Sequence, residues 1–172
     1  MSSADTEKYA PQVATHRRTT SAILSTTKEL IARSGVAKIS MIEISDESEV
    51  SRATLYNHYR DKESVLRALV ESEFARLIDA AGKGNTPQEI LQILSQEIST
   101  DSALATMRTT DPALLTQILT HQNDELWSTF LHSFSQLIPD HVLAATSLRW
   151  LIGQVFAPLT PEQSKIQSEA LS

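Results

Sequence analysis

Apolar residues in the first part of the sequence recur at intervals of three and four, the spacing that places side chains on one face of an α-helix. The first such stretch runs from about His16 to Ser34, and Gly35 follows it as a helix-terminating residue. The preceding residues 1–14 are polar and aperiodic. We therefore expect a disordered tail followed by a first helix.

Capping residues predict three more helices in quick succession. Ser40 opens an S-x-x-E capping box and predicts a short helix that ends near Ser48. Ser51 can cap a second short helix, from Arg52 to Tyr59, and Asp61 can cap a longer one. The apolar stripe of this longer helix is Val65, Leu66, Leu69, Val70, Phe74, Leu77 and Ile78.

Gly82, Gly84 and Asn85 mark the best domain boundary in the sequence. Beyond it, a capping residue precedes a proline at Thr86, Asp111 and Thr160, which predicts three helix starts. The pattern between Asp111 and Pro139 predicts one long helix of about 40 Å. Two further helices are expected over 140–157 and, more briefly, over 102–109. Because no alternating strand pattern is present, we predict an all-α protein of about nine helices.

The composition narrows the class of protein. The chain has 172 residues, of which 41% are hydrophobic and 21% charged, as in an ordinary globular protein. It has no cysteine, which excludes disulfides, zinc knuckles and thiol catalysis. No apolar run is long enough to span a bilayer and no secretory signal precedes the helices, so we expect a cytoplasmic protein without membrane contact.

Charge is distributed unevenly along the chain. Residues 1–82 carry 11 Lys and Arg against 12 Asp and Glu, whereas residues 83–172 carry 4 against 9. The cations are therefore concentrated in the N-terminal half, but neither half is strongly basic. Any contact with a polyanion must be local.

The stretch from Ser40 to Glu63 has the dimensions of a helix-turn-helix, with a tight turn over 48–50. At 100° per residue, Leu55 and Tyr59 share the packing side of its second helix. On the other side, the guanidinium of Arg52 suits a guanine edge and the amide of Asn57 suits adenine. The hydroxyls of Thr54 and Tyr56 and the ammonium of Lys62 suit phosphate oxygens.

This stretch resembles the tetracycline-repressor (TetR) family of bacterial transcription regulators. Its core fits V-S-x-x-T-L-Y-x-x-[FY]-x-x-K-E, and the resemblance covers about 65 residues, from Arg17 to Ala81. The matching residues are Ile44, Val50, Ser51, Thr54, Leu55, Tyr56, Tyr59, Lys62 and Glu63. The resemblance implies an N-terminal three-helix DNA-binding domain, joined through helix four to a C-terminal domain that binds a ligand and forms a homodimer.

On this basis we divide the chain into a tail (1–14), a DNA-binding domain (15–62), a connecting helix (63–84) and a ligand-binding and dimerisation domain (85–172). The expected partners are double-stranded operator DNA, a second copy of the chain and an unidentified small-molecule effector. The candidate DNA contacts are Arg17, Arg18, Ser40, Ser51, Arg52, Ala53, Thr54, Tyr56, Asn57, His58 and Lys62.

Two features depart from the family pattern. The turn normally reads Ala-Gly-Val-Ser, but Glu49 stands here in the glycine position, where a left-handed backbone costs a side chain about 1–2 kcal/mol. Glu43, Asp46 and Glu47 also make the first helix of the motif acidic, which lowers the expected affinity for phosphate. Ser45 replaces the usual alanine that faces helix one.

Aromatic and soft side chains in the C-terminal half suit an apolar or amphipathic ligand, although packing within a core also accounts for such a stripe. The candidate ligand contacts are Phe74, Met107, Gln117, His121, Trp127, Phe130, Phe134 and Trp150. The candidate dimer contacts are Leu148, Leu151, Ile152 and Val155. The histidines lack the spacing of a metal site and no catalytic motif is present, so we expect neither enzyme activity nor a cofactor.

The leading hypothesis is a dimeric repressor that a small ligand releases from its operator. A regulator controlled by a protein partner, or by none, with a fully packed C-terminal core, is one alternative. A third hypothesis is a TetR-like helical protein with weak or no DNA binding that acts through a protein partner; Glu49 and the acidic first helix of the motif motivate it.

Overall fold

The computed structural model describes residues 3–120 and 125–171, with side chains from residue 14 onward, and this part of the chain is entirely helical. The helices are α1 (Ser3–Ser34), the 3₁₀ turn η1 (Val36–Lys38), α2 (Met41–Glu47), α3 (Arg52–His58), α4 (Lys62–Ala81), α5 (Pro87–Thr100), α6 (Ser102–Thr110), α7 (Pro112–Thr120), α8 (Glu125–Leu137), α9 (His141–Phe156) and α10 (Pro161–Leu171). The all-α class is confirmed, with ten α-helices in the described ranges where about nine were predicted.

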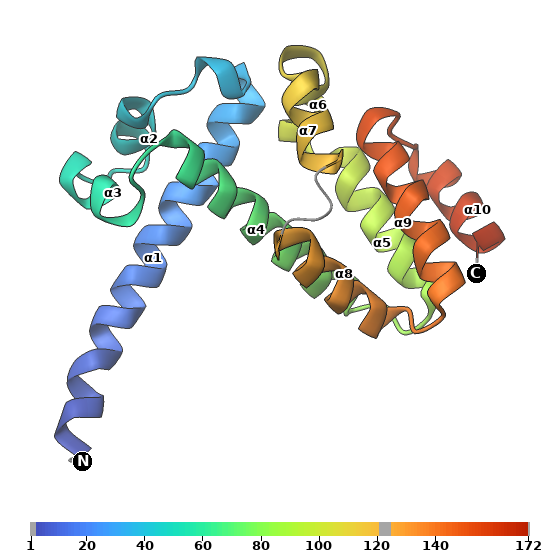
Figure 1. The fold of residues 1–172 in the computed structure, drawn as a ribbon, viewed down its shortest axis with the longest axis horizontal. Helices are drawn as coiled ribbons and strands as arrows, with labels where there is room; N and C mark the ends of the chain where they lie inside the picture. The colour runs from blue at the N-terminus through green and yellow to red at the C-terminus, as the bar shows by residue number, and fades with distance from the viewer. Residues whose placement is uncertain (1–2, 121–124, 172) are drawn as a thin grey trace.

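Helix α1 begins well before the predicted start. The sequence predicts a tail over 1–14, whereas the structure places the first helical residue at Ser3. Figure 1 shows the early turns of α1 as a rod that projects beyond the other N-terminal helices. The tail was predicted because residues 1–14 are polar and aperiodic. Pro11 lacks an N–H group and cannot donate a helical hydrogen bond, but it does not end this helix.

The N-terminal domain is a small bundle made of α1 to α4. Its core includes Ile23, Ile44, Leu55 and Val65, each fully buried. The three predicted caps are confirmed, because the side chains of Ser40, Ser51 and Asp61 accept hydrogen bonds from the backbone N–H three residues later. These caps fix where α2, α3 and α4 begin, and so fix the turn between α2 and α3.

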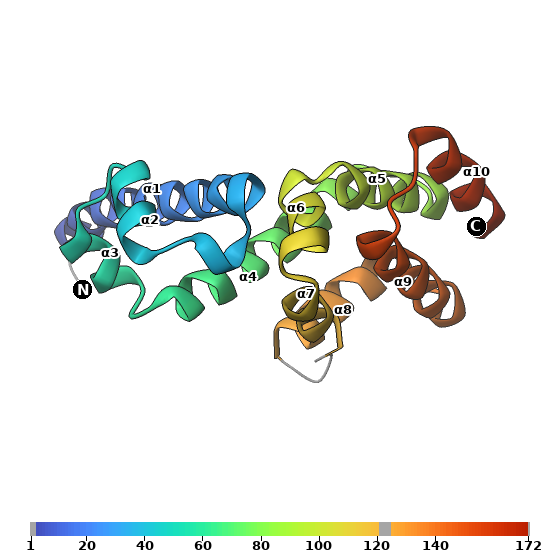
Figure 2. The same cartoon turned by 90° about the horizontal axis from the view of Figure 1, so that it is seen from above.

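Helix α4 runs from the N-terminal domain into the C-terminal one, where it packs against α5 and α8. Helices α9 and α10 lie at the far end of the molecule from α2 and α3 (Figures 1 and 2). Helix α1 packs mainly against α6 and α4. The contact between α1 and α6 joins the two domains directly.

The predicted single helix between Asp111 and Pro139 is wrong. Helix α7 ends at Thr120 and α8 begins at Glu125. The indole Nε1 of Trp127 donates to the carbonyl of Ile118 at 2.8 Å, whereas nine residues of one straight helix would span about 13 Å. Helix α8 therefore folds back against α7. The polar residues 121–124 lie outside the described residues.

None of the helices in the described ranges is long and apolar enough to cross a membrane.

Candidate DNA-reading helix and ligand pocket

The turn between α2 and α3 is held by backbone and hydroxyl hydrogen bonds. The Ser45 hydroxyl donates to the carbonyl of Val50 at 2.7 Å, and the Val50 N–H donates to the carbonyl of Ser45 at 3.2 Å. Glu49 adopts a φ of 57°, the left-handed conformation that glycine normally supplies at this position. The turn thus keeps the tight form despite the strain of about 1–2 kcal/mol that a side chain brings there.

Helix α3 has one buried and one open side, as the sequence predicts. Leu55 is fully buried, whereas Arg52, Ala53, Tyr56 and Asn57 are exposed, Tyr56 to 54%. The hydroxyl of Thr54, which is half-buried, lies 2.8 Å from that of Ser51. The groups suited to base edges therefore face solvent, on a helix that Leu55 anchors from behind.

His58, at the end of α3, contacts α1 rather than standing free. Its ring stacks on that of His16 with centroids 4.3 Å apart, and its Nδ1 lies 3.3 Å from the hydroxyl of Thr20. Burial, and then the nearby His16, lower the pKa of His58. Arg17 and Arg18 are exposed and lie within α1.

Lys62 has partners inside the protein. Its ammonium donates to the carbonyls of Val36 and Ile39, at 3.1 Å each. Two of its three N–H groups are thus used to hold the η1 segment against the start of α4. The phosphate contact expected of Lys62 stays a prediction. Ser40, the remaining candidate, is exposed, and its hydroxyl donates to the carboxylate of Glu43 at 2.8 Å.

A carboxylate at the α6–α7 corner joins the two domains. Asp111 accepts hydrogen bonds from the backbone N–H groups of Val36 at 2.8 Å and Ala37 at 3.1 Å, and from the Thr110 hydroxyl at 2.5 Å. Burial alone raises the pKa of Asp111, but these hydrogen bonds and the positive charge of Lys62 outweigh it and lower the pKa. The sequence identified Asp111 only as a cap for the following helix, because nothing local indicates a partner 75 residues away.

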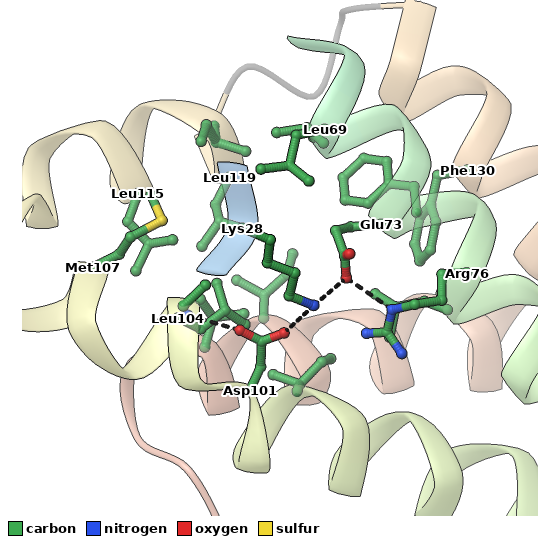
Figure 3. A pocket seen from close by; sticks show the side chains of 18 of the residues that line it. Lys28, Leu69, Glu73, Arg76, Asp101, Leu104, Met107, Leu115, Leu119 and Phe130 are labelled. Carbon is green, nitrogen blue, oxygen red and sulfur yellow. Dashed lines mark hydrogen bonds and ion pairs between the residues drawn. The ribbon is translucent and has the colours of Figure 1, made fainter. Parts of the chain in front are cut away.

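The C-terminal domain contains an apolar pocket of about 290 Å³ between α1 and the helices α4 to α9 (Figure 3). Four of the predicted ligand contacts line it: Phe74, Met107, Trp127 and Phe130. The ring of Phe74 lies 5.0 Å from that of Trp127 and 4.7 Å from that of Phe130, measured between centroids. One end of the pocket is therefore an aromatic cluster.

Other predicted ligand contacts lie elsewhere. Phe134 is fully packed in the core, and Trp150 donates its indole N–H to the side-chain oxygen of Gln167 at 2.7 Å, so neither lines the pocket. Both were assigned from helical spacing, which does not show what a side chain faces. Gln117 is exposed beside a separate, smaller depression. His121 lies outside the described residues.

The predicted dimer contacts Leu148, Leu151, Ile152 and Val155 point inward. All four line the pocket, and Leu151 and Val155 are also buried. The prediction took the most apolar stripe of α9 for a surface between subunits, but this stripe packs within the chain. The opposite side of α9 is the exposed one.

Beside the aromatic cluster, the pocket lining contains a cluster of charged side chains that sequence reasoning missed (Figure 3). Lys28 of α1 lies 2.7 Å from a carboxylate oxygen of Glu73 and 2.7 Å from one of Asp101. Arg76 contacts Glu73 at 2.8 Å and Glu97 at 2.5 Å. Burial lowers the pKa of Lys28, but its carboxylate partners outweigh this effect and raise it. These residues come from three separate parts of the chain, so no local sequence pattern predicts the cluster.

No three His, Cys, Asp or Glu side chains gather as a metal site requires within residues 3–120 and 125–171.

Residues 23–69, which include the turn and both of its helices, match the family model of bacterial regulatory proteins, tetR family. The chain has a TetR-family fold. TetR-family proteins are DNA-binding transcription factors and not enzymes. No curated protein matches the sequence as a whole at a significant level.

Solved TetR-family structures resemble the whole chain. The fatty acid degradation regulator FadR from Bacillus halodurans has a TM-score of 0.67 at 17% identity, covering 88% of this chain and 93% of that one. The repressor AlkX from Dietzia, implicated in biodegradation of n-alkanes, has a TM-score of 0.62 at 18% identity, with 87% and 93% covered. A regulator from Aquifex aeolicus has a TM-score of 0.59 at 17% identity, with 89% and 95% covered. At these identities the likeness shows the TetR fold.

Proposed function

We propose that this TetR-type chain is a transcriptional regulator whose helix α3 lies in the major groove of an operator. The observation that supports this most is the two-sided character of α3, in which a fully buried Leu55 stands behind the exposed Arg52, Tyr56 and Asn57. A guanidinium fork and an amide on one open helix face are the groups that distinguish guanine and adenine edges.

The surrounding candidates are assigned to the DNA backbone. Arg17 and Arg18 are exposed on α1, and Ser40 and Ser51 stand exposed at the starts of α2 and α3. Contacts of this kind fix the position of a protein on the duplex without reading its sequence. In the proposed complex, Ala53 and Thr54 complete the surface of α3, and His58 and Lys62 flank it.

Replacing Arg52 with alanine is expected to weaken binding to a specific operator by about 1–3 kcal/mol, or roughly 5-fold to 150-fold, and to relax the preference at one base pair. The operator is first selected from fragments of the source genome, and affinity is then measured by fluorescence anisotropy. Lys83→Ala removes one positive charge from an exposed position just after α4, away from α3 and from the outer sides of α9 and α10, and serves as the control. Equal losses in the two variants would refute the assignment of α3.

The alternative of a TetR-like protein without DNA binding is favoured by one observation. Glu43, Asp46 and Glu49 are exposed on α2 and its following turn, beside the surface that would meet phosphates. A salt titration with random duplex separates the two functions, because DNA binding through cations weakens linearly in log K against log salt. A weak, salt-independent response would support the alternative.

The pocket supports a sensor role for the C-terminal domain. Its size and apolar walls are those of a small-molecule site, which argues against a fully packed core. The TetR-type relatives FadR and AlkX are named for fatty acid degradation and n-alkane biodegradation, both of which concern apolar chains. We therefore assign to this chain the role of a repressor that leaves its operator when an apolar ligand fills the pocket.

A homodimer completes the proposal, with the outer sides of α9 and α10 as its interface. Three exposed apolar side chains lie there, namely Val142 at 78%, Phe156 at 47% and Ile166 at 58% exposure. An added Cβ at Gly153, on the same side of α9, would meet nothing within 4 Å, so another helix has room to approach. Each of the two copies would contribute one α3 helix, and an operator would present its two half-sites about one turn of DNA, or a multiple of it, apart.

The double variant Phe156→Glu, Ile166→Glu is expected to convert the dimer to a monomer, because two carboxylates would be buried without partners. Sedimentation velocity at micromolar concentration measures the change. Ile42→Glu, on exposed α2, is the matched control and leaves the oligomeric state unchanged. A wild-type chain that sediments as a monomer would remove this part of the proposal.

A further inference from the structure

The chemistry of the pocket walls specifies its ligand more closely than its size does. Aliphatic and aromatic side chains from seven helices form most of the lining, which also includes the charged cluster of Lys28, Glu73, Arg76, Glu97 and Asp101. Figure 3 shows Glu73 and Arg76 of this cluster beside Phe130. The question is whether this cluster is available to a ligand.

Each of the two cations of the cluster is already paired with two carboxylates. Lys28 donates to Glu73 and contacts Asp101, and Arg76 bonds to Glu73 through Nε and to Glu97 through Nη1. The Asp101 carboxylate also accepts from the backbone N–H of Leu104 at 2.9 Å. A ligand carboxylate would have to compete with these carboxylates for the two cations, and it would lose its own hydration in a cavity that almost no polar surface faces.

The balance of charge also opposes an anion. The lining contains two cations, Lys28 and Arg76, against four carboxylates, those of the cluster and the exposed Glu63. A cationic ligand is opposed in another way. Almost none of the surface that faces the cavity comes from polar atoms, so an ammonium would lose its hydration with little to replace it.

The polar groups in the apolar walls are occupied as well. The indole N–H of Trp127 donates to the carbonyl of Ile118 on α7 at 2.8 Å. The backbone carbonyl of Val155, a lining residue, accepts from the guanidinium of Arg108 at 2.5 Å; Arg108 itself does not line the pocket. Because these groups bond within the chain, the described walls offer a ligand few hydrogen-bond partners. Binding would therefore depend mainly on the burial of apolar surface.

We propose that the pocket binds an uncharged, hydrocarbon-like molecule of about ten carbon atoms and discriminates against a carboxylate or an ammonium on the same skeleton. The size follows from comparison with a dry apolar cavity of about 150 Å³, which holds one benzene molecule. At about 290 Å³ the pocket has room for a ring and a short alkyl chain. The ligand class is argued from the pocket alone. Only the expected release of the operator rests on the proposed sensor role.

Three probes with one skeleton test the proposal: butylbenzene, 4-butylbenzoate and (4-butylphenyl)trimethylammonium. Differential scanning fluorimetry and isothermal titration calorimetry with the full chain measure binding. Butylbenzene is expected to raise the melting temperature, and the two charged probes to bind at least tenfold more weakly. If either charged probe binds the wild-type chain as tightly as butylbenzene, or if none of the three binds, the proposal is overturned.

Two variants place the binding in this pocket. Leu148→Phe adds volume to the lining and is expected to abolish the butylbenzene signal, whereas Ile42→Phe makes a similar addition at an exposed position of α2 and retains it. Circular dichroism confirms that each variant is folded. Butylbenzene binding that survives Leu148→Phe in a folded protein would contradict the assignment to this pocket.

A third variant tests the charged cluster. Glu73→Gln preserves the shape of the side chain but removes the carboxylate that Lys28 and Arg76 share. For this variant, we expect the dissociation constant of 4-butylbenzoate, divided by that of butylbenzene, to be about tenfold smaller than for the wild-type chain. An unchanged ratio would show that the cluster does not set the selectivity and would overturn that part of the proposal.

The same samples separate this inference from the proposed function. If butylbenzene binds but does not change operator affinity, the ligand class stands and the sensor role fails. If the operator is bound but no probe is, the regulator stands and the ligand class fails.

Discussion

Replacing Gly35 with alanine is expected to lower the free energy of unfolding by about 3 kcal/mol. Gly35 has φ 82° and ψ 165°, a region that is open essentially to glycine alone and costs other residues about 1–3 kcal/mol. An added Cβ would also lie 2.6 Å from Oδ2 of Asp111, closer than real Cβ atoms come. The α6–α7 corner would have to shift, at a cost of about 1–3 kcal/mol.

Chemical denaturation followed by circular dichroism measures the effect, with Gly82→Ala as the matched control. Gly82 has φ −63°, and an added Cβ there would meet its nearest atoms at 3.5 Å, an ordinary contact. We expect the control to change stability by less than about 1 kcal/mol. A Gly35→Ala protein as stable as the control would show that the contact between η1 and Asp111 is looser than its geometry indicates.

Replacing Leu55 with alanine is expected to cost about 2–5 kcal/mol and to abolish specific DNA binding. Leu55 is fully buried in the core that holds Ile23, Ile44 and Val65, and truncation of a buried leucine leaves a cavity that its neighbours fill only in part. Helix α3 has only seven residues, too few to be stable without this packing. Loss of the anchor therefore removes the surface that would meet the groove.

Denaturation and operator binding are measured on the same preparation. Ile42→Ala, on α2, removes a comparable side chain that is half exposed, and we expect it to change stability by less than about 1 kcal/mol. If Leu55→Ala lowered stability as expected but left operator affinity unchanged, DNA would have to bind at a surface other than α3.

The parts of the fold that sequence reasoning predicted are those with local causes. Ser40, Ser51 and Asp61 each cap a helix through a bond to an N–H three residues away, so the chain near each start contains the whole signal. The two-sided character of α3 likewise follows from helical spacing. Spacing and the family resemblance together were enough to predict the helix-turn-helix.

The parts that could not be predicted depend on partners far away in the sequence. Periodicity identified the apolar stripe of α9 that contains Leu151, but it could not show that this stripe faces a pocket and not a second subunit. The bond from Val36 to Asp111 and the ion pair of Lys28 with Glu73 cross 75 and 45 residues. Such pairs form only when the whole chain is folded, so no window of sequence contains them.

The positions of the two tryptophans make the intrinsic fluorescence of the protein a measure of events in the C-terminal domain. Trp127 is buried in the aromatic cluster of the pocket, whereas Trp150 on α9 contacts Gln167 on α10. The three tyrosines all lie in the first 59 residues. Emission excited at the red edge of the indole band therefore originates from the C-terminal domain alone. A Trp150→Phe protein would report on occupancy of the pocket, and a Trp127→Phe protein on the packing of the last two helices.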